Sequence, residues 1–366
     1  MQVSTRKNIR RLIWLMVAAI ICGAVFLFLP ALGLGHDGPP QKDMKIDQAT
    51  RLEVIEAVIA NVNQHYVFPE KAAAMEKRLR LELKNGTYDN VTSANELAEK
   101  LSESLQAQTQ DKHLEIRYFE ETLAVQKPGQ ELESEKLREQ SENIRLNYGF
   151  HNVDRLPFNI GYIDLHAFAD SPHAFERMAA AMNLLGDTRA MIIDLRKNGG
   201  GSPDTVAQYA SYFHDKRTHL NDIYMREENK TTEMWTTETL AGKKYGEKRK
   251  LYLLTSADSF SAAEDFAYAM KNNKRATIIG EVTGGGAHPG DRYRLSAHFM
   301  MNVPGGRTIS PITHTDWETI GVQPDIKVSA DDALDQAQLI ILKDFLKTEK
   351  DPEWRAHLEE SIAELD

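Results

Sequence analysis

Residues 251–271, LYLLTSADSFSAAEDFAYAMK, read as a strand, a short turn and a helix. The apolar run LYLL is typical of a strand buried in a sheet, and small polar residues form the turn. From Ser261 onward, apolar residues recur at the spacing of an amphipathic helix. A serine at this place has two interpretations: it caps the helix, or it is a nucleophile that points into a cleft.

The same alternation of strands and helices continues on both sides of this stretch. The predicted elements are helices at 172–186, 204–213 and 331–348 and strands at 189–195, 250–254 and 276–280. Strands separated by helices favour a layered α/β domain. We place this domain at residues 161–350, with a C-terminal tail at 351–366.

The chain before this domain is different in character. Apolar residues at helical spacing predict three helices in residues 41–115, which form a small helical N-terminal domain. The segment DKHLEIRYF then alternates like a strand. Residues 116–160 combine a charged arm with short strands.

Composition excludes some classes of function. The net charge is −10 over 366 residues, which argues against nucleic acid as a partner because phosphates demand clustered lysine and arginine. The only cysteine is Cys22. The domain after it therefore has neither a disulfide nor a catalytic thiol, and a covalent nucleophile there must be a hydroxyl, an amine or a carboxylate.

Residues 1–40 form a membrane anchor or signal segment followed by a linker. Four basic residues between positions 6 and 11 precede an apolar run over 12–34, long enough for the roughly 20 residues that span a bilayer. We expect a single-pass anchor in the cell membrane with residues 36–366 outside the cytoplasm, in the periplasm. The alternative is export after cleavage of a signal peptide. Cys22 is a lipid acceptor or one more membrane-facing side chain.

Two glycine-rich loops and the acidic residue Glu264 accompany Ser261. The turn RKNGGGSP exposes backbone N–H groups that suit an oxyanion, although it is also explained as a tight turn. Glu264 shares the helix face of Ser261 and either orients a base or complements the helix dipole. His288 lies in the second loop, GEVTGGGAHPG. Among the 12 histidines no paired ligand spacing occurs, so we predict no metal, and the sequence indicates no cofactor.

Together these motifs resemble the C-terminal processing (tail-specific) protease family. The likeness is closest to the branch of interphotoreceptor retinoid-binding protein-like domains and the tricorn core protease. It is carried, in family order, by HYVFPEKAAAM, DKHL, DLRKNGGGSP, SFSAAEDFAY, GEVTGGGAHPG and GVQPDI. The resemblance implies an α/β fold with a crotonase/Clp protease-like spiral of ββα units behind a helical N-terminal domain.

The same resemblance implies roles for individual residues. Ser261 matches the nucleophile, and its oxyanion hole would combine the Ala262 N–H with a backbone N–H from Gly199 or Gly200. Tail-specific members carry a lysine base where this chain has Gly286.

The tricorn branch uses a histidine instead of that lysine, and His113 in DKHL falls at its place. Glu318 falls where that branch has its supporting acid. The serine that precedes the histidine in that branch is Lys112 here. His288 remains a rival base, and Glu264 matches the lysine-type pattern.

Two hypotheses follow for the function. The first is a membrane-anchored, exported serine peptidase that acts on a peptide or protein through an acyl-enzyme. The second is a non-catalytic carrier of hydrophobic, retinoid-like ligands on the same fold. The roughly 40 residues between Arg117 and Phe158 are too few for the family's PDZ domain, so recognition of a free C-terminus is not expected. The sequence leaves the oligomeric state open.

Overall fold

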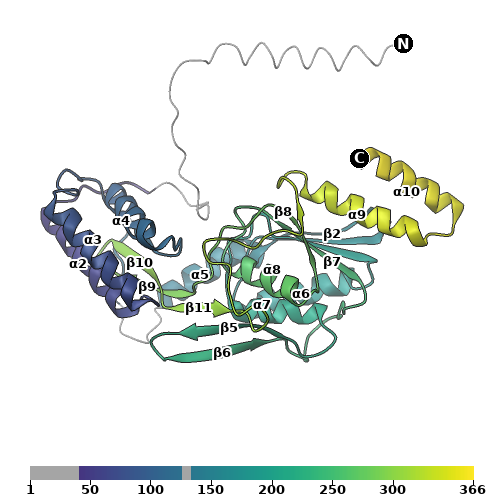
Figure 1. Cartoon of the computed structure of the whole chain (residues 1–366), viewed down its shortest axis with the longest axis horizontal. Helices are drawn as coiled ribbons and strands as arrows, with labels where there is room; N and C mark the ends of the chain where they lie inside the picture. The colour runs from purple at the N-terminus through teal and green to yellow at the C-terminus, as the bar shows by residue number, and fades with distance from the viewer. Residues whose placement is uncertain (1–40, 126–132) are drawn as a thin grey trace, which may run out of the picture. The chain divides into compact units, whose positions relative to one another are not determined.

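The computed structural model describes residues 41–125 and 133–366 (Figure 1). Its helices are α2 (Gln48–His65), α3 (Pro69–Lys84), α4 (Ala94–Thr109), α5 (Glu133–Arg145), α6 (Pro172–Leu185), α7 (Pro203–Ala210), α8 (Ala262–Asn272), α9 (Ala333–Thr348) and α10 (Pro352–Leu365). Its strands are β1 (Glu115–Tyr118), β2 (Phe150–Leu156), β3 (Ile160–Leu165), β4 (Ala190–Asp194), β5 (His219–Met225), β6 (Lys230–Trp235), β7 (Lys250–Thr255), β8 (Thr277–Gly280), β9 (Gly290–Arg294), β10 (Phe299–Pro304), β11 (Gly306–Ile309) and β12 (Ile326–Lys327). Three short 3-10 helices cover Asn147–Gly149, Pro157–Asn159 and Ser211–Phe213.

The apolar N-terminal run lies outside these described ranges. Within them, no helix has both the length and the apolar character that crossing a bilayer requires. The membrane segment therefore stays a prediction.

The central element is a six-stranded sheet with the order β12-β8-β7-β4-β3-β2. Its strands run parallel from β3 through β12, and only the edge strand β2 is antiparallel. Parallel strands need crossover connections, which the helices between them supply. The predicted α/β architecture is confirmed. The carboxyl ends of β4 and β7, which are neighbours, lie at the same edge.

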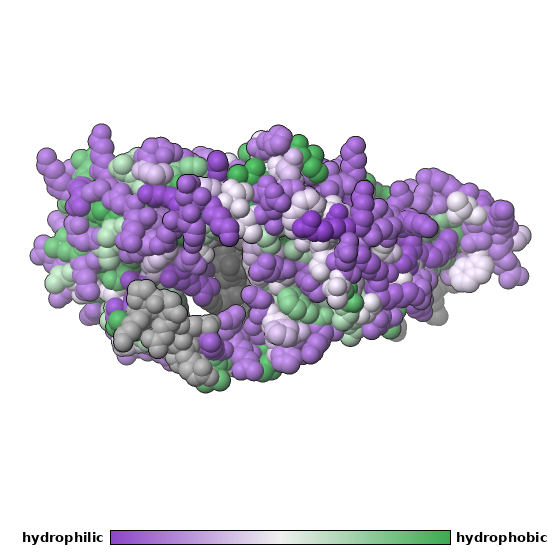
Figure 2. Space-filling model, turned by 90° about the horizontal axis from the view of Figure 1, so that it is seen from below, coloured by the Kyte–Doolittle hydropathy of each residue, from purple (hydrophilic) through white to green (hydrophobic). Residues whose placement is uncertain are grey.

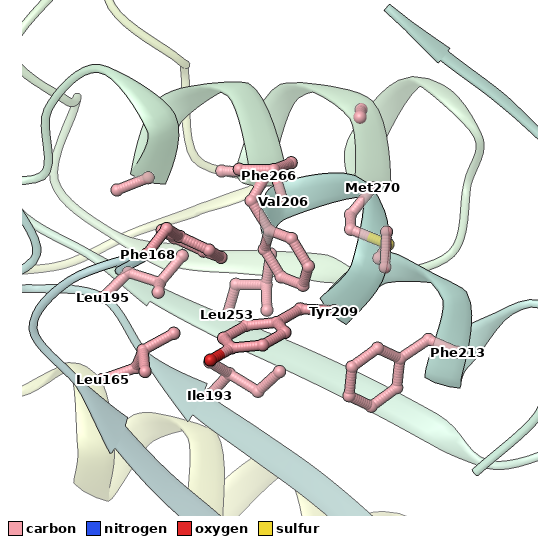
Figure 3. Close-up of a cluster of buried hydrophobic side chains, with 14 of the residues drawn as sticks. Leu165, Phe168, Ile193, Leu195, Val206, Tyr209, Phe213, Leu253, Phe266 and Met270 are labelled. Atoms are coloured by element: carbon pink, nitrogen blue, oxygen red, sulfur yellow. The ribbon is translucent and has the colours of Figure 1, made fainter. Parts of the chain in front are cut away.

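Both faces of this sheet are buried, as a parallel sheet requires. In β4, Met191 and Ile193 pack on one side, and Ala190 and Ile192 pack on the other. Helices α6, α7 and α8 contribute to the first core, and α9 and α10 contribute to the second. Figure 3 shows the first core, where these labelled side chains meet: Leu165, Phe168, Ile193, Leu195, Val206, Tyr209, Phe213, Leu253, Phe266 and Met270.

Helices α2, α3 and α4 build a separate core in which a later segment also takes part. The hairpin β9–β10 pairs with β1, and Phe299, Met301 and Val303 pack among the apolar side chains of the three helices. The predicted helical domain over residues 41–115 therefore does not enclose its whole core, because the chain returns to it between 290 and 304. This return brings the loop before β9 to the segment before β1.

The predicted charged arm contains helix α5, and β2 begins at Phe150. A further small sheet has the order β11-β5-β6. The face drawn in Figure 2 is mostly hydrophilic, with hydrophobic residues in small separate groups. This distribution is that of a solvated surface.

We predict that Leu253→Ala lowers the free energy of unfolding by about 2–5 kcal/mol, since Leu253 is fully buried in the first core. Urea denaturation measures this loss. Leu184→Ala is the matched control because 66% of that side chain is exposed, and its effect should stay within about 0.5 kcal/mol. Equal losses in the two variants would contradict the placement of this core.

Candidate active site

The turn that follows β7 is bound to the glycine turn that follows β4. The hydroxyls of Ser256 and Ser259 donate to the carbonyl oxygens of residues 196 and 195 at 2.5 and 2.7 Å. The Phe260 N–H donates to the carbonyl oxygen of Asn198 at 3.0 Å. The hydroxyls of these two serines therefore join the two turns and do not cap α8. Ser261 is the next serine in the chain and directly precedes α8.

Ser261 has an unusual backbone conformation, with φ 56° and ψ −118°. A non-glycine residue at such angles is strained, and the surrounding structure must hold it there. Gly200 lies directly against it, because a Cβ built on Gly200 would come within 2.8 Å of the Ser261 Cβ. The N–H groups of Glu264 and Asp265 donate to the Ser261 carbonyl oxygen at 2.9 and 3.0 Å. The Ser261 carbonyl oxygen thus accepts hydrogen bonds from the first turn of helix α8.

The Glu264 carboxylate holds this conformation from inside the protein. It accepts hydrogen bonds from the Ser261 N–H at 2.9 Å, the Gly286 N–H at 2.8 Å, the Gly285 N–H at 2.7 Å and the Thr283 hydroxyl at 2.5 Å. Burial raises the pKa of Glu264 to about 7, although all four hydrogen bonds favour the charged form. Glu264 therefore binds the Ser261 turn to the loop over 283–286. Its side chain is fully buried in this contact.

His113 lies at the Ser261 turn. Its ring packs against the ring of Phe260, the residue before Ser261, with 4.6 Å between ring centroids. A Cβ on Gly286 would come within 2.4 Å of two Phe260 ring atoms and 2.7 Å of His113 Cε1. The two rings thus fill the space that a side chain at position 286 would enter. The structure brings His113 and Gly286 to Phe260, the residue before Ser261.

Asp111, which the sequence analysis did not single out, forms the buried centre of a network behind His113. Its Oδ2 atom is 2.7 Å from His288 Nδ1 and accepts from the Tyr66 hydroxyl at 3.1 Å, and its Oδ1 accepts from the His113 N–H at 3.1 Å. Burial opposes the charged imidazole of His288, but the hydrogen bond and charge of Asp111 raise its pKa overall. His288 is buried and committed to Asp111, which disfavours it as the base.

Glu318 completes this cluster. Its Oε2 accepts from the Ala287 N–H at 2.6 Å, whereas its buried Oε1 has no hydrogen-bond partner. His113 Nδ1 is also buried without a partner. One ligand-type atom each of Asp111, His113 and Glu318 lies within 4.8 Å of the other two. Burial and the Asp111 charge raise the pKa of Glu318, and burial lowers the pKa of His113.

The backbone N–H groups predicted to form the oxyanion hole differ in whether they already donate a hydrogen bond. The Gly199 N–H donates to the His166 carbonyl oxygen at 3.2 Å, and the Gly200 N–H donates to Asn198 Oδ1 at 2.9 Å. In the ranges that the structure describes, the Ala262 N–H donates to no protein acceptor. Ala262 is therefore the available donor, while Gly200 could serve only after leaving Asn198. Both Gly199 and Gly200 are held in the turn by these bonds.

Sequence reasoning missed Asp111, Tyr66, Phe260 and Asn198. Asp111 and Tyr66 lie in the motifs DKHL and HYVFPEK, which carry the family resemblance. No spacing pattern in the sequence indicated a role for either side chain. Lys112, the residue between Asp111 and His113, donates to the Gly284 carbonyl oxygen at 2.6 Å. It therefore contacts the 283–286 loop from the other side.

Comparison with known proteins agrees with this organisation. The model of peptidase family S41 matches residues 159–328, and the model of the N-terminal domain of Peptidase_S41 in eukaryotic IRBP matches residues 48–146. The chain belongs to peptidase family S41. The predicted family and the interphotoreceptor retinoid-binding protein-like N-terminal part are confirmed.

Individual relatives are distant. The chain is 30% identical over 166 residues to carboxyl-terminal-processing peptidase 2, chloroplastic, of Arabidopsis thaliana, which covers 45% of this chain and 31% of that protein. It is 30% identical over 169 residues to the carboxyl-terminal-processing protease of Synechocystis, and this match covers 46% of this chain and 37% of that protein. The matches thus span about a third of the length of these curated relatives. A putative peptidase from Parabacteroides merdae shares the fold, with a TM-score of 0.53, 20% identity and coverage of 76% of this chain and 90% of that one.

We predict that Glu264→Gln destabilises the protein, because the new amide nitrogen cannot accept the hydrogen bonds that one carboxylate oxygen receives. Each buried donor left without an acceptor costs about 1–3 kcal/mol, so the free energy of unfolding should fall by several kcal/mol. Urea denaturation at pH 8 measures the change. Glu238→Gln, on an exposed side chain, is the control, and a loss no larger than in that variant would contradict the structural role of Glu264.

Proposed function

We propose that this chain is a serine peptidase that cleaves peptide bonds through an acyl-enzyme on Ser261. The Ser261 Oγ attacks the carbonyl carbon, and its proton passes to the His113 imidazole and then to the leaving amine. The Ala262 N–H stabilises the oxyanion, and water then hydrolyses the ester to release the acid and free the serine. Glu318 supports the imidazolium that forms during each transfer.

The strained backbone of Ser261 is the observation that carries this proposal. A helix cap needs no such conformation, and strained residues of this kind occur where they expose a nucleophile between a strand and a helix. The cluster behind His113 supports it further. Nδ1 of His113 and Oε1 of Glu318 are buried without partners and are complementary as donor and acceptor, and their side chains belong to one cluster.

The contacts of Gly286 support a histidine base over a lysine. Phe260 and His113 occupy the space beside Gly286, so the chain has replaced the lysine of the tail-specific members with an imidazole that reaches the same turn from another segment. An imidazole also suits proton transfer near neutral pH, whereas a lysine must be held neutral by burial.

The substrate class is a peptide or protein. The relatives named above are carboxyl-terminal-processing enzymes, but this chain lacks room for a PDZ domain, since β1 ends at Tyr118 and β2 begins at Phe150. We therefore expect cleavage that does not depend on a free C-terminus. A carrier of hydrophobic ligands would not need the strained serine, so we favour the peptidase.

We also propose that residues 12–34 anchor the protein in the membrane with the described domains outside the cytoplasm. The ββα spiral of crotonases and Clp proteases is the finer architecture that we infer for the sheet and its helices. The order of the parallel strands β3, β4, β7 and β8 with a helix after each of the first three supports this inference.

We predict that Ser261→Ala abolishes peptide hydrolysis and labelling by a fluorophosphonate probe while leaving the melting temperature within a few degrees of the wild type. A serine that acts only as a cap would give the opposite result. Its loss would cost about 0.5–2 kcal/mol of stability and spare activity. Turnover and melting temperature measured on the same preparation separate the two outcomes.

We predict that kcat/KM rises with pH and is level above about pH 7.5, as expected for an imidazole base. Burial lowers the pKa of His113 from 6.5, the charges of Asp111 and Glu115 oppose this effect, and the charge of His288 adds to it. Glu318 lies in the same cluster, so Glu318→Gln should shift the pH at which kcat/KM rises. A profile that rises only above about pH 9 would instead identify a lysine base.

A further inference from the structure

The buried cluster around His113 contains three side chains of the types that bind transition metals. Asp111, His113 and Glu318 each place one ligand atom within 4.8 Å of the other two. Asp111 and His113 are two residues apart, but Glu318 lies about 200 residues further along the chain, so no local spacing in the sequence marks the three as a group. The prediction of no metal rested on spacing alone and does not address such a cluster.

Two buried polar atoms of these side chains lack partners in the protein. His113 Nδ1 and Glu318 Oε1 are buried and make no hydrogen bond. The Glu318 side chain is only 10% exposed, and that of His113 is 14% exposed. Buried polar atoms normally have a partner, so each of these needs one. Asp111, which is fully buried, faces the same space, with Oδ1 3.9 Å from His113 Nδ1.

The separations would suit one small cation after the cluster closes around it. Two ligands of a tetrahedral zinc ion lie about 3.4 Å apart, since each bond is about 2.0–2.2 Å long. The 3.9 Å separation would close by about half an ångström, and the widest separation in the group, at most 4.8 Å, by about 1.4 Å at most. One nitrogen and two carboxylate oxygens favour zinc over calcium or magnesium, which take oxygen ligands.

We propose that Asp111, His113 and Glu318 form an inhibitory site for Zn²⁺. The metal would bind His113 Nδ1 and Glu318 Oε1, which make no hydrogen bond in the protein. His288 and Tyr66, which hold the other oxygen of Asp111 at 2.7 and 3.1 Å, act as the outer contacts that orient this ligand. Zinc would therefore engage the same imidazole and carboxylate that the proposed mechanism uses.

Inhibition follows from the tautomer of the imidazole. When Nδ1 binds zinc, the proton of the neutral ring is on Nε2. The nitrogen that would accept the Ser261 proton is then already protonated, so the ring cannot act as a base. This consequence rests on the proposed function, whereas zinc binding itself does not.

Calorimetric titration of the EDTA-treated full chain with ZnCl2 tests the site. We expect one zinc ion per chain in both the wild type and Ser261→Ala, whose cluster is intact. Asp111→Asn and Glu318→Gln should each weaken the affinity about 10–100-fold. Asp164→Asn is the matched control, because Asp164 pairs with His166 at 3.0 Å without belonging to a three-ligand group in the described chain, and it should leave the affinity unchanged.

Circular dichroism shows whether each variant folds, and Co²⁺ absorption of the wild type gives a test that needs no variant. An intense visible band from Co²⁺ bound through nitrogen and oxygen ligands, lost on adding one equivalent of Zn²⁺, supports the site. In the wild type, zinc should also suppress fluorophosphonate labelling, and EDTA should restore it. Absence of zinc binding, or equal affinity in the wild type, Asp111→Asn and Glu318→Gln, would overturn the proposal. Labelling without zinc reports on the proposed peptidase independently.

Discussion

The four hydrogen bonds accepted by the buried Glu264 carboxylate are the interaction on which the candidate site depends. Its Oε2 accepts from the N–H groups of the strained Ser261 and of Gly286, and its Oε1 accepts from the Thr283 hydroxyl and the Gly285 N–H of the 283–286 loop. The loop in turn places Gly286 against Phe260 and His113. A single buried acid thus links the strain at Ser261, the proposed nucleophile, to the position of His113, the proposed base. Its pKa, raised to about 7, shows the free-energy cost of placing a carboxylate there.

The second constraint is the return of the chain to its N-terminal core. Hairpin β9–β10 pairs with β1 and packs among helices α2–α4, so the loop that carries His288 is held next to Asp111. His113 is presented from the segment before β1, whereas Ser261 comes from the turn after β7. The proposed base and the proposed nucleophile therefore belong to different cores, and the hairpin and the loop before it join those cores at the candidate site.

Much of the fold could be predicted from the sequence, for physical reasons. The apolar runs of β4 and β7 and the helical spacing in α8 report burial on both faces of a parallel sheet, and the neighbouring strands place Ser261 beside Gly200. The role of Glu264 was not predictable, because its partners are backbone N–H groups of a distant loop and leave no pattern in the sequence. Asp111 was missed because the side chains that bind it, Tyr66 and His288, lie far from it in the sequence. The resemblance implied Gly199 and Gly200 as oxyanion donors, yet the His166 carbonyl oxygen and the Asn198 side chain accept from them.

The most direct test of this account is to locate the covalent adduct after reaction of the folded protein with a fluorophosphonate. Tandem mass spectrometry of the digested, phosphonylated protein assigns the modified residue. The account predicts one adduct per chain, on Ser261, with Ser256 and Ser259 unmodified because their hydroxyls donate to the glycine turn. An adduct on another residue, or an unmodified Ser261 in protein that hydrolyses peptides, would contradict it.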